Sequence, residues 1–423
     1  MRFETADFAQ RETRVRTVLV DPSLFTIPYD AALAQGLSDA GAEVHLFGRE
    51  PGADEVWPLA DVPLHPLFYR GLQRADRLPK RLRLPLKGAL HAVDTARFIG
   101  AMRRLKPSVI HYQWSVLPMV DRLAFPALRR IAPLVLTVHD TAPFNNNPSS
   151  GLQTLLTDKA YRSFDRVIVH TPAGRQRLIG MGLDPSRVAV IEHGLLTPVA
   201  VPPDAPSRSA ATPVTFLLFG KMKPYKGADV FIEAIAKIPE EIRARCRFIV
   251  AGKPYMDTAP LRALVEQRGL RDAVALDLRH FPEAEMQSLL AQADVLVFPY
   301  REIEASGVLL SSLPLGKAIV ASGIGGFRDM LAEGEAALLV PVDDSEALSR
   351  ALTRVASDQD LRSRLGDNAR RRAAAIPDWA TIARKTEDLY ADAIAAWNDA
   401  RPHGDPARRG VPDLRSFASK QDS

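Results

Sequence analysis

Short apolar runs alternate along this chain with longer segments in which apolar residues recur every three or four positions. The first run lies at 15–20, and a polar loop, a helical pattern over about 31–40 and a second run at 42–47 follow it. Apolar runs of this length, separated by amphipathic helices, predict a doubly wound sheet of parallel strands. The first loop has no Gly-x-Gly-x-x-Gly pattern, so we do not expect a nicotinamide or flavin site there.

Four more strands are predicted in the first half of the chain, at 107–111, 134–138, 166–169 and 188–191. Each of them ends in or next to a histidine, namely His111, His139, His170 and His193. Ligands of open α/β sheets bind at the carboxyl ends of the strands. A single histidine there is more often a structural group than a reactive one, but a row of them on one edge favours a site.

The pattern stops at a stretch from about 196 to 211 that is rich in Pro, Ser and Ala, and then restarts. The following strands are predicted at 214–219, 247–251, 274–277 and 295–298, with helices at 228–238, 259–268 and 284–291. We interpret the stretch as an interdomain linker and the second pattern as another parallel α/β domain. A long amphipathic helix is predicted over 378–397, and a disordered tail is expected after it.

The segment 295–329 combines a buried strand, a polar loop, a helix, a strand at 317–322 and a loop that contains Gly323, Gly325 and Gly326. Ser306 and Gly307 would place unpaired N–H groups at the start of its helix, where anions bind. Taken alone, an ordinary turn with a serine N-cap explains this segment better.

Composition restricts the class of protein. The chain has 423 residues, 46% of them hydrophobic and 25% charged, and its net charge is +5. This length and this hydrophobic fraction predict two domains with sizeable cores. Its one cysteine, Cys246, excludes an intrachain disulfide and fits a reducing compartment. The polar N-terminus does not resemble a signal peptide, and no apolar run approaches the ~18–20 residues of a spanning helix. We therefore expect a cytoplasmic protein, soluble or peripheral to a membrane.

Residues 70–87 carry a local excess of positive charge, interleaved with leucines. The cations are Arg70, Arg74, Arg77, Lys80, Arg81, Arg83 and Lys87, against the single acid Asp76. Such a segment suits an anionic membrane surface, and a solvated basic loop explains it equally well. Nucleic acid is the weaker interpretation, because few aromatic residues are available for base stacking.

Several segments together resemble the nucleotide-sugar glycosyltransferases of family 4, which have the two-domain GT-B fold. They are FGKMKPYKG at 219–227, ADVLVFPY at 293–300, EASGVLLSSLPLGKAIVAS at 304–322, LTVHD at 136–140 and PSRVAVIEHG at 185–194. The resemblance covers roughly residues 14–397. It implies two Rossmann-like doubly wound domains: an acceptor domain over 14–195, a hinge over 196–211, a donor domain over 212–375, a terminal helix over 376–397 that packs back on the first domain, and a tail over 398–423.

The resemblance also assigns roles on the donor side. A basic pair, here Lys221 and Lys226, holds the donor diphosphate, and Lys221 stands where arginine is usual. Ser306, Gly307 and Val308 would offer backbone amides to the same phosphates, so the cradle needs no metal. His280, within 279–281, lies where backbone groups usually meet the nucleotide base.

Two more donor positions follow from the family's paired glutamates, which are eight residues apart. Glu304 matches the first, and Ser312 occupies the second, where it can make one hydrogen bond to the ribose instead of a bidentate grip. His139 matches the histidine that points at the donor sugar, and Asp140 adjoins it. On the acceptor side the resemblance leaves Tyr29, Asp30 and Asp140 as candidates.

The implied reaction is the transfer of a hexose from a nucleotide diphosphate sugar to a hydroxyl of a glycan or lipid-linked glycan. Configuration is retained, no metal or cofactor takes part, and the enzyme would work at the inner face of the membrane. Glu304, His139 and Lys226 are the expected catalytic residues. Two alternatives stay open: another GT-B nucleotide-sugar enzyme such as an epimerase, and an inactive nucleotide-sugar-binding module. The sequence leaves UDP and GDP donors equally open.

Overall fold

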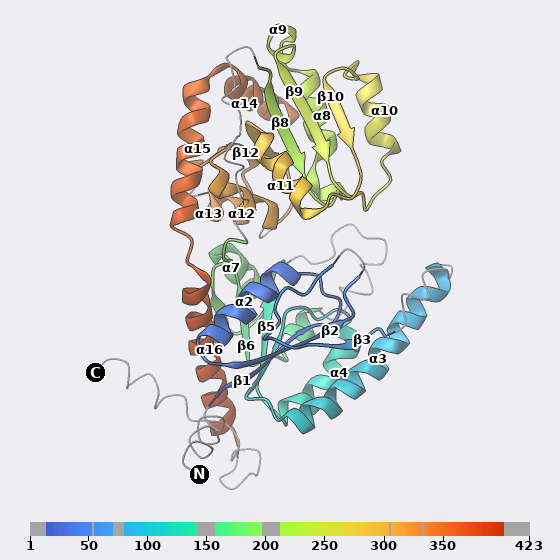
Figure 1. Ribbon diagram of the computed structural model, residues 1–423, viewed down its shortest axis with the longest axis vertical. Helices are drawn as coiled ribbons and strands as arrows, with labels where there is room; N and C mark the ends of the chain where they lie inside the picture. The colour runs from blue at the N-terminus through green and yellow to red at the C-terminus, as the bar shows by residue number, and fades with distance from the viewer. Residues whose placement is uncertain are drawn as a thin grey trace, which may run out of the picture. The chain divides into compact units, whose positions relative to one another are not determined.

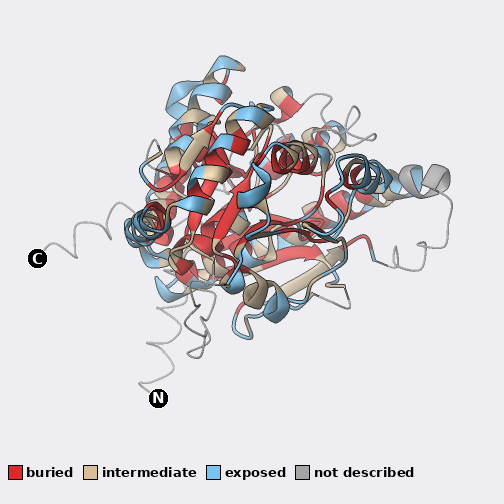
Figure 2. Cartoon of the chain, turned by 90° about the horizontal axis from the view of Figure 1, so that it is seen from above, coloured by how far each residue is buried: buried red, intermediate tan, exposed pale blue. Residues whose placement is uncertain are grey.

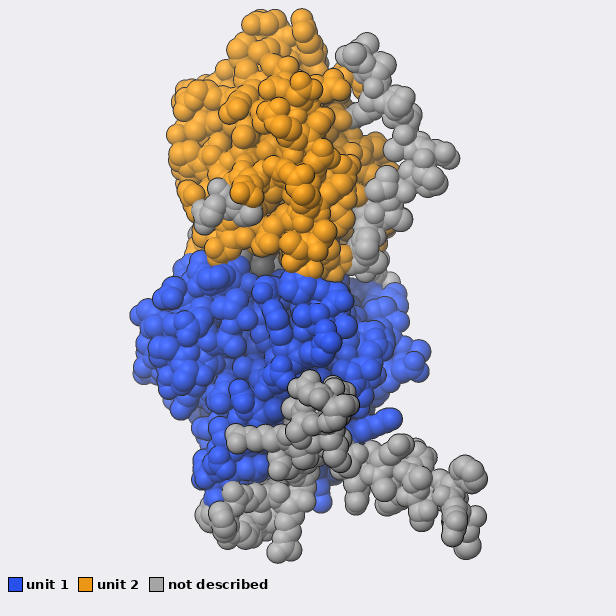
Figure 3. Space-filling view, turned by 90° about the vertical axis from the view of Figure 1, so that its left-hand side faces the viewer, with its two compact units in different colours: residues 1–144, 148–194, 377–423 blue, residues 145–147, 195–376 orange. Residues whose placement is uncertain are grey.

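Two parallel β-sheets, each flanked by helices, make up the fold in a computed structural model (Figure 1). The structure describes residues 14–52, 55–70, 80–141, 157–196, 212–303, 306–331 and 334–401, with the backbone alone at 80–84. Contacts divide the chain into two compact units (Figure 3). Unit 1 comprises residues 1–144, 148–194 and 377–423, and unit 2 comprises 145–147 and 195–376. Most of the expected hinge, 197–211, lies outside the described residues.

The sheet of unit 1 has seven parallel strands in the order β3-β2-β1-β4-β5-β6-β7. They are β1 (Arg16–Asp21), β2 (Glu43–Arg49), β3 (Leu64–Phe68), β4 (Val109–Tyr112), β5 (Leu134–Val138), β6 (Arg166–Val169) and β7 (Val188–Val190). All but β3 were predicted, and the predicted ends are correct to within two residues. The strand order reverses between β1 and β4, which is where an open α/β sheet places its ligand.

The helices of unit 1 are less well predicted than its strands. They are α2 (Ile27–Asp39), α3 (Lys80–Leu105), α4 (Pro118–Arg129), α6 (Thr157–Tyr161), α7 (Pro172–Gly180), η2 (Pro185–Arg187) and α16 (Trp379–Asp399). The basic-loop interpretation is wrong for residues 80–87, which open α3, while 71–79 lie outside the described residues. The sequence obscured α3 because Pro85 and several arginines interrupt its apolar spacing. Helix α2 begins earlier than predicted, because Pro28 suits the first helical turn.

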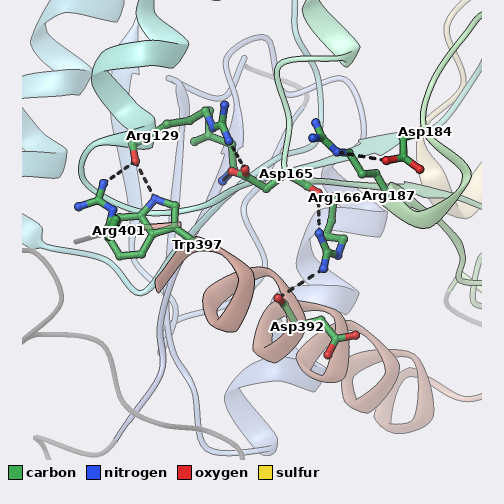
Figure 4. A network of polar contacts seen from close by, with 9 residues as sticks. Arg129, Asp165, Arg166, Asp184, Arg187, Asp392, Trp397 and Arg401 are labelled. Carbon is green, nitrogen blue, oxygen red and sulfur yellow. Dashed lines mark hydrogen bonds and ion pairs between the residues drawn. The ribbon is translucent and has the colours of Figure 1, made fainter. Parts of the chain in front are cut away.

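Helix α16 closes unit 1 although it comes from the far end of the chain. It packs beside α2, where a Cβ on Gly36 would lie only 2.8 Å from the carbonyl oxygen of Trp379. At the other end, the carbonyl oxygen of Arg129 accepts hydrogen bonds from Trp397 Nε1 at 2.7 Å and from Arg401 at 3.0 Å (Figure 4). One of the helices that cover the sheet of unit 1 therefore comes from the C-terminal segment.

Unit 2 holds a six-stranded parallel sheet in the order β10-β9-β8-β11-β12-β13. The strands are β8 (Val214–Phe219), β9 (Cys246–Ala251), β10 (Val274–Asp277), β11 (Val295–Phe298), β12 (Ala318–Ser322) and β13 (Leu338–Val340). The helices are η3 (Pro224–Lys226), α8 (Ala228–Ala236), α9 (Glu240–Arg243), α10 (Ala259–Gln267), α11 (Glu283–Gln292), α12 (Gly307–Ser312), η4 (Leu313–Leu315), α13 (Gly325–Met330), α14 (Ser345–Ser357) and α15 (Gln359–Ala374). The predicted strands are correct to within one residue, but Gly325 and Gly326, expected in a loop, begin α13.

Both faces of the unit 2 sheet are buried (Figure 2). Phe216 and Phe248 pack with α8, α10 and α14 on one face, and Leu296 and Phe298 pack with α11 to α13 and α15 on the other. Two covered faces explain why the strands read as continuous apolar runs and not as alternating patterns. Packing on both faces fixes the positions of the strand ends, so the loops that follow the strands can hold a binding site.

The close approach of α2 and α16 predicts the effect of one substitution. Gly36→Ala should lower the free energy of unfolding by about 1–3 kcal/mol, because the new methyl group meets backbone atoms that cannot move freely. Gly100→Ala in α3 is the matched control, since no atom lies within 4 Å of its Cβ position. Denaturant unfolding should show a gain of up to about 1 kcal/mol for the control from helix propensity. Equal effects of the two substitutions would contradict the packing of α16 on α2.

Candidate functional site

The loop after β8 lies close to neighbouring backbone at two glycines. Gly220 has φ +139°, and a Cβ on Gly252 would lie 1.9 Å from its carbonyl oxygen. Gly227 has φ +66°, and a Cβ there would lie 2.0 Å from the carbonyl oxygen of Pro299. Only glycine fits such a contact. As a result the η3 turn lies directly against the end of β11, and its last residue, Lys226, faces the residues that follow that strand.

Lys226 is a buried cation, with a residue exposure of 4%. Its Nζ donates a hydrogen bond to the hydroxyl of Tyr300 and lies 4.1 Å from the centre of the same ring. The missing side chain of Gly220 leaves room beside it, since a Cβ there would lie 2.9 Å from Nζ. Burial lowers the pKa of Lys226 to about 7, and the charges of Lys223 and Lys221 contribute to this shift. The site thus holds a cation that lacks most of its hydration.

Arg301 joins the loop after β11 to the η3 turn, and sequence reasoning did not identify it. Its backbone N–H donates to the carbonyl of Tyr225 at 2.8 Å. Its guanidinium grips both carboxylate oxygens of Asp229 at 3.0 and 2.7 Å, and contacts Asp343 and the carbonyl of Pro224. The signal that could have suggested the clamp is an arginine in the loop after the buried strand β11, together with an acid in the first turn of α8, the helix that follows the neighbouring strand β8. This clamp keeps Lys226 in place beside Tyr300.

The start of α12 reaches the same place. The Ser306 hydroxyl accepts from Leu309 N at 3.3 Å, as an N-cap does, and it lies close enough to the Tyr300 phenol to influence its pKa. A Cβ on Gly220 would lie 3.6 Å from Val308 Cγ2, and Gly307 is exposed. The first amides of a helix lack a carbonyl partner within that helix. The structure therefore brings Lys226, Ser306, Gly307 and Val308 together in unit 2.

The remaining donor-side candidates have different positions. Lys221 is exposed on the same loop and close enough to influence Lys226. His280 is exposed, between Arg279 and a phenylalanine that packs edge-on against Phe219. Ser312 is buried, and its hydroxyl donates to the carbonyl of Val308 at 2.7 Å, so its proton is committed to its own helix. Glu304 lies outside the described residues.

In unit 1 three of the four predicted histidines gather around one tyrosine, while His111 hydrogen-bonds to Tyr390 and Thr137. The ring of Tyr29 lies 4.6 Å from His139, 4.9 Å from His193 and 5.3 Å from His170, measured between centres. Burial lowers the pKa of His170 to about 3 and that of His193 to about 4. Burial and the neighbouring histidines also lower the pKa of His139. The imidazoles are therefore neutral near pH 7.

Hydrogen bonds define the tautomers of two of these histidines. His170 Nδ1 donates to the carbonyl of Ile191 at 3.0 Å, so its Nε2 accepts from His139 Nδ1 at 3.2 Å. His139 Nε2 then has no proton, yet it faces Oε1 of Gln113 at 3.1 Å while Gln113 Nε2 is buried without a partner. Turning the Gln113 amide over satisfies both groups. Both ring nitrogens of His139 are consequently engaged within unit 1.

A buried pair of carboxyl groups holds the loop after β1. Asp21 accepts from the backbone N–H of Ser23 and of Thr26, both at 3.2 Å, and Asp30 hydrogen-bonds to Asp21. Burial raises the pKa of Asp21 to about 6 and that of Asp30 well above its usual range, where the Asp21 charge adds to the effect. The two groups share a proton near neutral pH. Asp30, an acceptor-side candidate, thus has no exposed surface and stabilises the loop.

The other acceptor-side candidates differ in exposure. Tyr29 is buried among the histidines. Asp140 is half-buried and lines a small pocket at the ends of β4 and β5, together with Trp114, Ser115 and His139. The Trp114 ring stacks on His139 at 5.4 Å between centres. Among the described residues, no group of three or more His, Cys, Asp or Glu side chains is arranged to hold a metal ion.

The carboxyl pair predicts a pH dependence of stability. Asp30 has a raised pKa in the folded state, so its contribution is complete below its unfolded pKa and is lost as the pH rises through the folded value. Asp30→Asn does not titrate, and it should gain up to ~1.4 kcal/mol per pH unit relative to the wild type over this range. Denaturant unfolding from about pH 5 to about pH 8 measures the difference. The control is Asp39→Asn, at the exposed end of α2, whose unfolding free energy should vary with pH as that of the wild type does. The same pH dependence in Asp30→Asn would contradict the shared proton.

Two family models match most of the chain. The model described as Glycosyltransferase Family 4 matches residues 31–197, and the one described as Glycosyl transferases group 1 matches residues 204–372. A D-inositol 3-phosphate glycosyltransferase of Thermobispora bispora is 27% identical, over 93% of this chain and 98% of that protein. The protein of the same name from Kineococcus radiotolerans is 29% identical, over 86% of this chain and 90% of its own length.

Solved structures share the fold. HepE of Anabaena, in complex with UDP and glucose, has a TM-score of 0.70 at 17% identity, covering 90% of this chain and 100% of that one. Sucrose-phosphate synthase from Thermosynechococcus elongatus has a TM-score of 0.71 at 19% identity, with the same coverage. At these identities the likeness concerns the two-domain architecture.

Proposed function

Because this chain belongs to the family 4 glycosyltransferases, which have the GT-B fold, we propose that it transfers a hexose from a nucleotide diphosphate sugar to a hydroxyl of a glycan or lipid-linked glycan. The transfer retains the configuration of the sugar and uses no metal or cofactor. The curated relatives are named for inositol 3-phosphate, so this compound joins the glycans as an acceptor to be assayed.

One observation carries the proposal: unit 2 buries the Lys226 ammonium beside a bare glycine and next to the first amides of α12. A buried cation is costly unless an anion compensates it. The oxygens of a diphosphate supply that charge, and they accept hydrogen bonds from an ammonium group and from backbone amides. The exposed Lys221 adds a second cation on the same loop.

The proposed reaction depends mainly on stabilising the leaving group. The bond from the anomeric carbon to the diphosphate oxygen breaks, and that oxygen keeps the electron pair. The acceptor oxygen bonds to the anomeric carbon on the same face, and its proton passes to the departing diphosphate. Lys226, Lys221 and the amides of Gly307 and Val308 would stabilise the growing phosphate charge, as preorganised donors do. Glu304 is proposed to hold hydroxyls of the sugar, and the segment 279–281 the base. His139 is proposed to join Glu304 by exchanging its contact with Gln113 for a sugar hydroxyl, since both of its ring nitrogens are engaged within unit 1.

Lys226→Ala tests the phosphate assignment. We expect this variant to lose donor binding and to lower the transfer rate by ~10²–10³, because one donor to the developing charge is removed. Calorimetry with nucleotide sugars, followed by a nucleotide-release assay with glycan and inositol 3-phosphate acceptors, measures both steps. Lys237→Ala is the control: this lysine bonds to Ser345 and Glu346 on the surface and should be dispensable. A transfer rate near that of the wild type in Lys226→Ala would reject the assignment.

Membrane contact through residues 70–87 is a second part of the proposal. Among the seven cations, the side chains of Arg70 and Lys87 are described: Arg70 Nε donates to the carbonyl of Pro66, and Lys87 Nζ lies 4.8 Å from the centre of the Tyr69 ring. No described helix is both long and apolar enough to cross a bilayer. Each cation near an anionic surface contributes ~1 kcal/mol to binding.

Reversing all seven charges should therefore release the protein from vesicles that contain anionic lipid in a flotation assay, and neutral vesicles serve as the control. Unchanged flotation would remove this part of the proposal.

A further inference from the structure

Tyr300, the second residue after β11, is fully buried and held by a set of aromatic rings. Its ring lies 5.3 Å from Phe327, 5.6 Å from Phe298 and 5.8 Å from Tyr225, measured between centres. Edge-on and tilted contacts at these distances are favourable and directional. The position of the Tyr300 hydroxyl is consequently set by the core of unit 2 and does not depend on a bound ligand.

The Tyr300 hydroxyl joins two groups of the proposed diphosphate site. An ammonium group can only donate, so the Tyr300 oxygen accepts from Lys226 Nζ. The Ser306 hydroxyl, at the start of α12, lies close enough to influence the same phenol. The same ring also presents its face to the ammonium, at 4.1 Å from Nζ to the ring centre. Tyr300 therefore stabilises the charged form of Lys226 by a hydrogen bond and by a cation–π contact.

Other charges near Lys226 do not replace this contact. Lys221 and Lys223 repel it, and Tyr225 offers a ring at 5.7 Å from Nζ. Asp229, in the first turn of α8, is gripped by Arg301. Within the described part of the chain, no hydrogen bond or ion pair connects Lys226 to a carboxylate, and Glu304 lies outside that part. The Tyr300 hydroxyl is thus the group that holds the ammonium before a ligand arrives.

We propose that Tyr300 is a positioning residue of the donor site, which keeps the Lys226 ammonium charged and aimed beside Gly220 so that a diphosphate meets a preformed receptor. This inference rests on the proposed function, because it assumes that Lys226 binds the diphosphate. Tyr300 itself touches neither the donor nor the reacting atoms.

The inference has a consequence that a merely structural tyrosine would not have. The pKa of Lys226 is lowered to about 7, so diphosphate affinity should fall as the pH rises through that value. Without the accepting oxygen of Tyr300 the charged amine is less stable, and the pKa falls further. In Tyr300→Phe the midpoint of the affinity loss should move to lower pH by ~1 unit. Near pH 8 the variant should bind ~10-fold more weakly than the wild type, and well below pH 6 the two should converge.

Calorimetric titration of the full chain with inorganic pyrophosphate, UDP, GDP and ADP, from about pH 5 to about pH 9, tests this expectation. Tyr225→Phe is the matched control, because it removes the same atom from a ring that contacts Tyr300, and its midpoint should equal that of the wild type. Lys226→Arg keeps the charge without titrating in this range, so its affinity should keep only the pH dependence that comes from ionisation of the ligand's own phosphates.

The outcomes separate this inference from the function on which it rests. A wild-type chain that binds none of the four probes overturns the proposed function and the inference with it. If the wild type binds and Tyr300→Phe loses affinity equally at every pH, the tyrosine has a structural role and the inference fails alone. The inference fails in the same way if the midpoint of Tyr300→Phe equals that of the wild type.

Discussion

The contact between Gly227 and the carbonyl of Pro299 determines how unit 2 presents its charge. A side chain at this glycine would overlap the carbonyl oxygen, at 2.0 Å from Cβ. Because the side chain is absent, the turn after β8 lies against the end of β11, and Lys226 is buried beside Tyr300. The clamp of Arg301 and the cap of α12 are built on the same junction. A lysine that sequence alone would place in solvent is in this way removed from water.

Burial disfavours the charged form in both units, but it leaves three of the histidines of unit 1 neutral and the pKa of Lys226 in unit 2 at about 7. In unit 1 burial removes charge: His139, His170 and His193 are neutral, and Asp21 shares a proton with Asp30. In unit 2 the ammonium of Lys226 has no carboxylate partner among the described residues, and a phenol oxygen and a ring face are its contacts. A neutral edge suits the binding of hydroxyl groups, whereas a buried cation favours an anion. This contrast agrees with an acceptor side in unit 1 and a donor side in unit 2.

The family pattern is altered at Lys221 and at Ser312, and the structure shows how the chain accommodates the second change. Ser312 stands where a second glutamate is usual, and its hydroxyl donates to the carbonyl of Val308 inside the helix. A buried serine hydroxyl can donate its hydrogen bond to a carbonyl of its own helix. The carboxylate of a glutamate at this position would have to bind a ligand or remain a buried charge without a partner. The donor site of this chain consequently depends more on its phosphate contacts than on a carboxylate at the ribose.

The sequence by itself determined the two parallel sheets and most of their strands, because runs such as 134–138 and 295–298 are apolar on both faces and end at polar residues. It also indicated which loops carry charge and glycine. It did not reveal α3, whose apolar spacing is interrupted by Pro85, and it did not identify Arg301 or Tyr300 as parts of the site. Tertiary structure alone decided that Lys226 is buried, that three histidines are neutral and that two aspartates share a proton. Burial, and with it the pKa of each group, depends on neighbours that are distant in the chain, and local pattern carries no information about them.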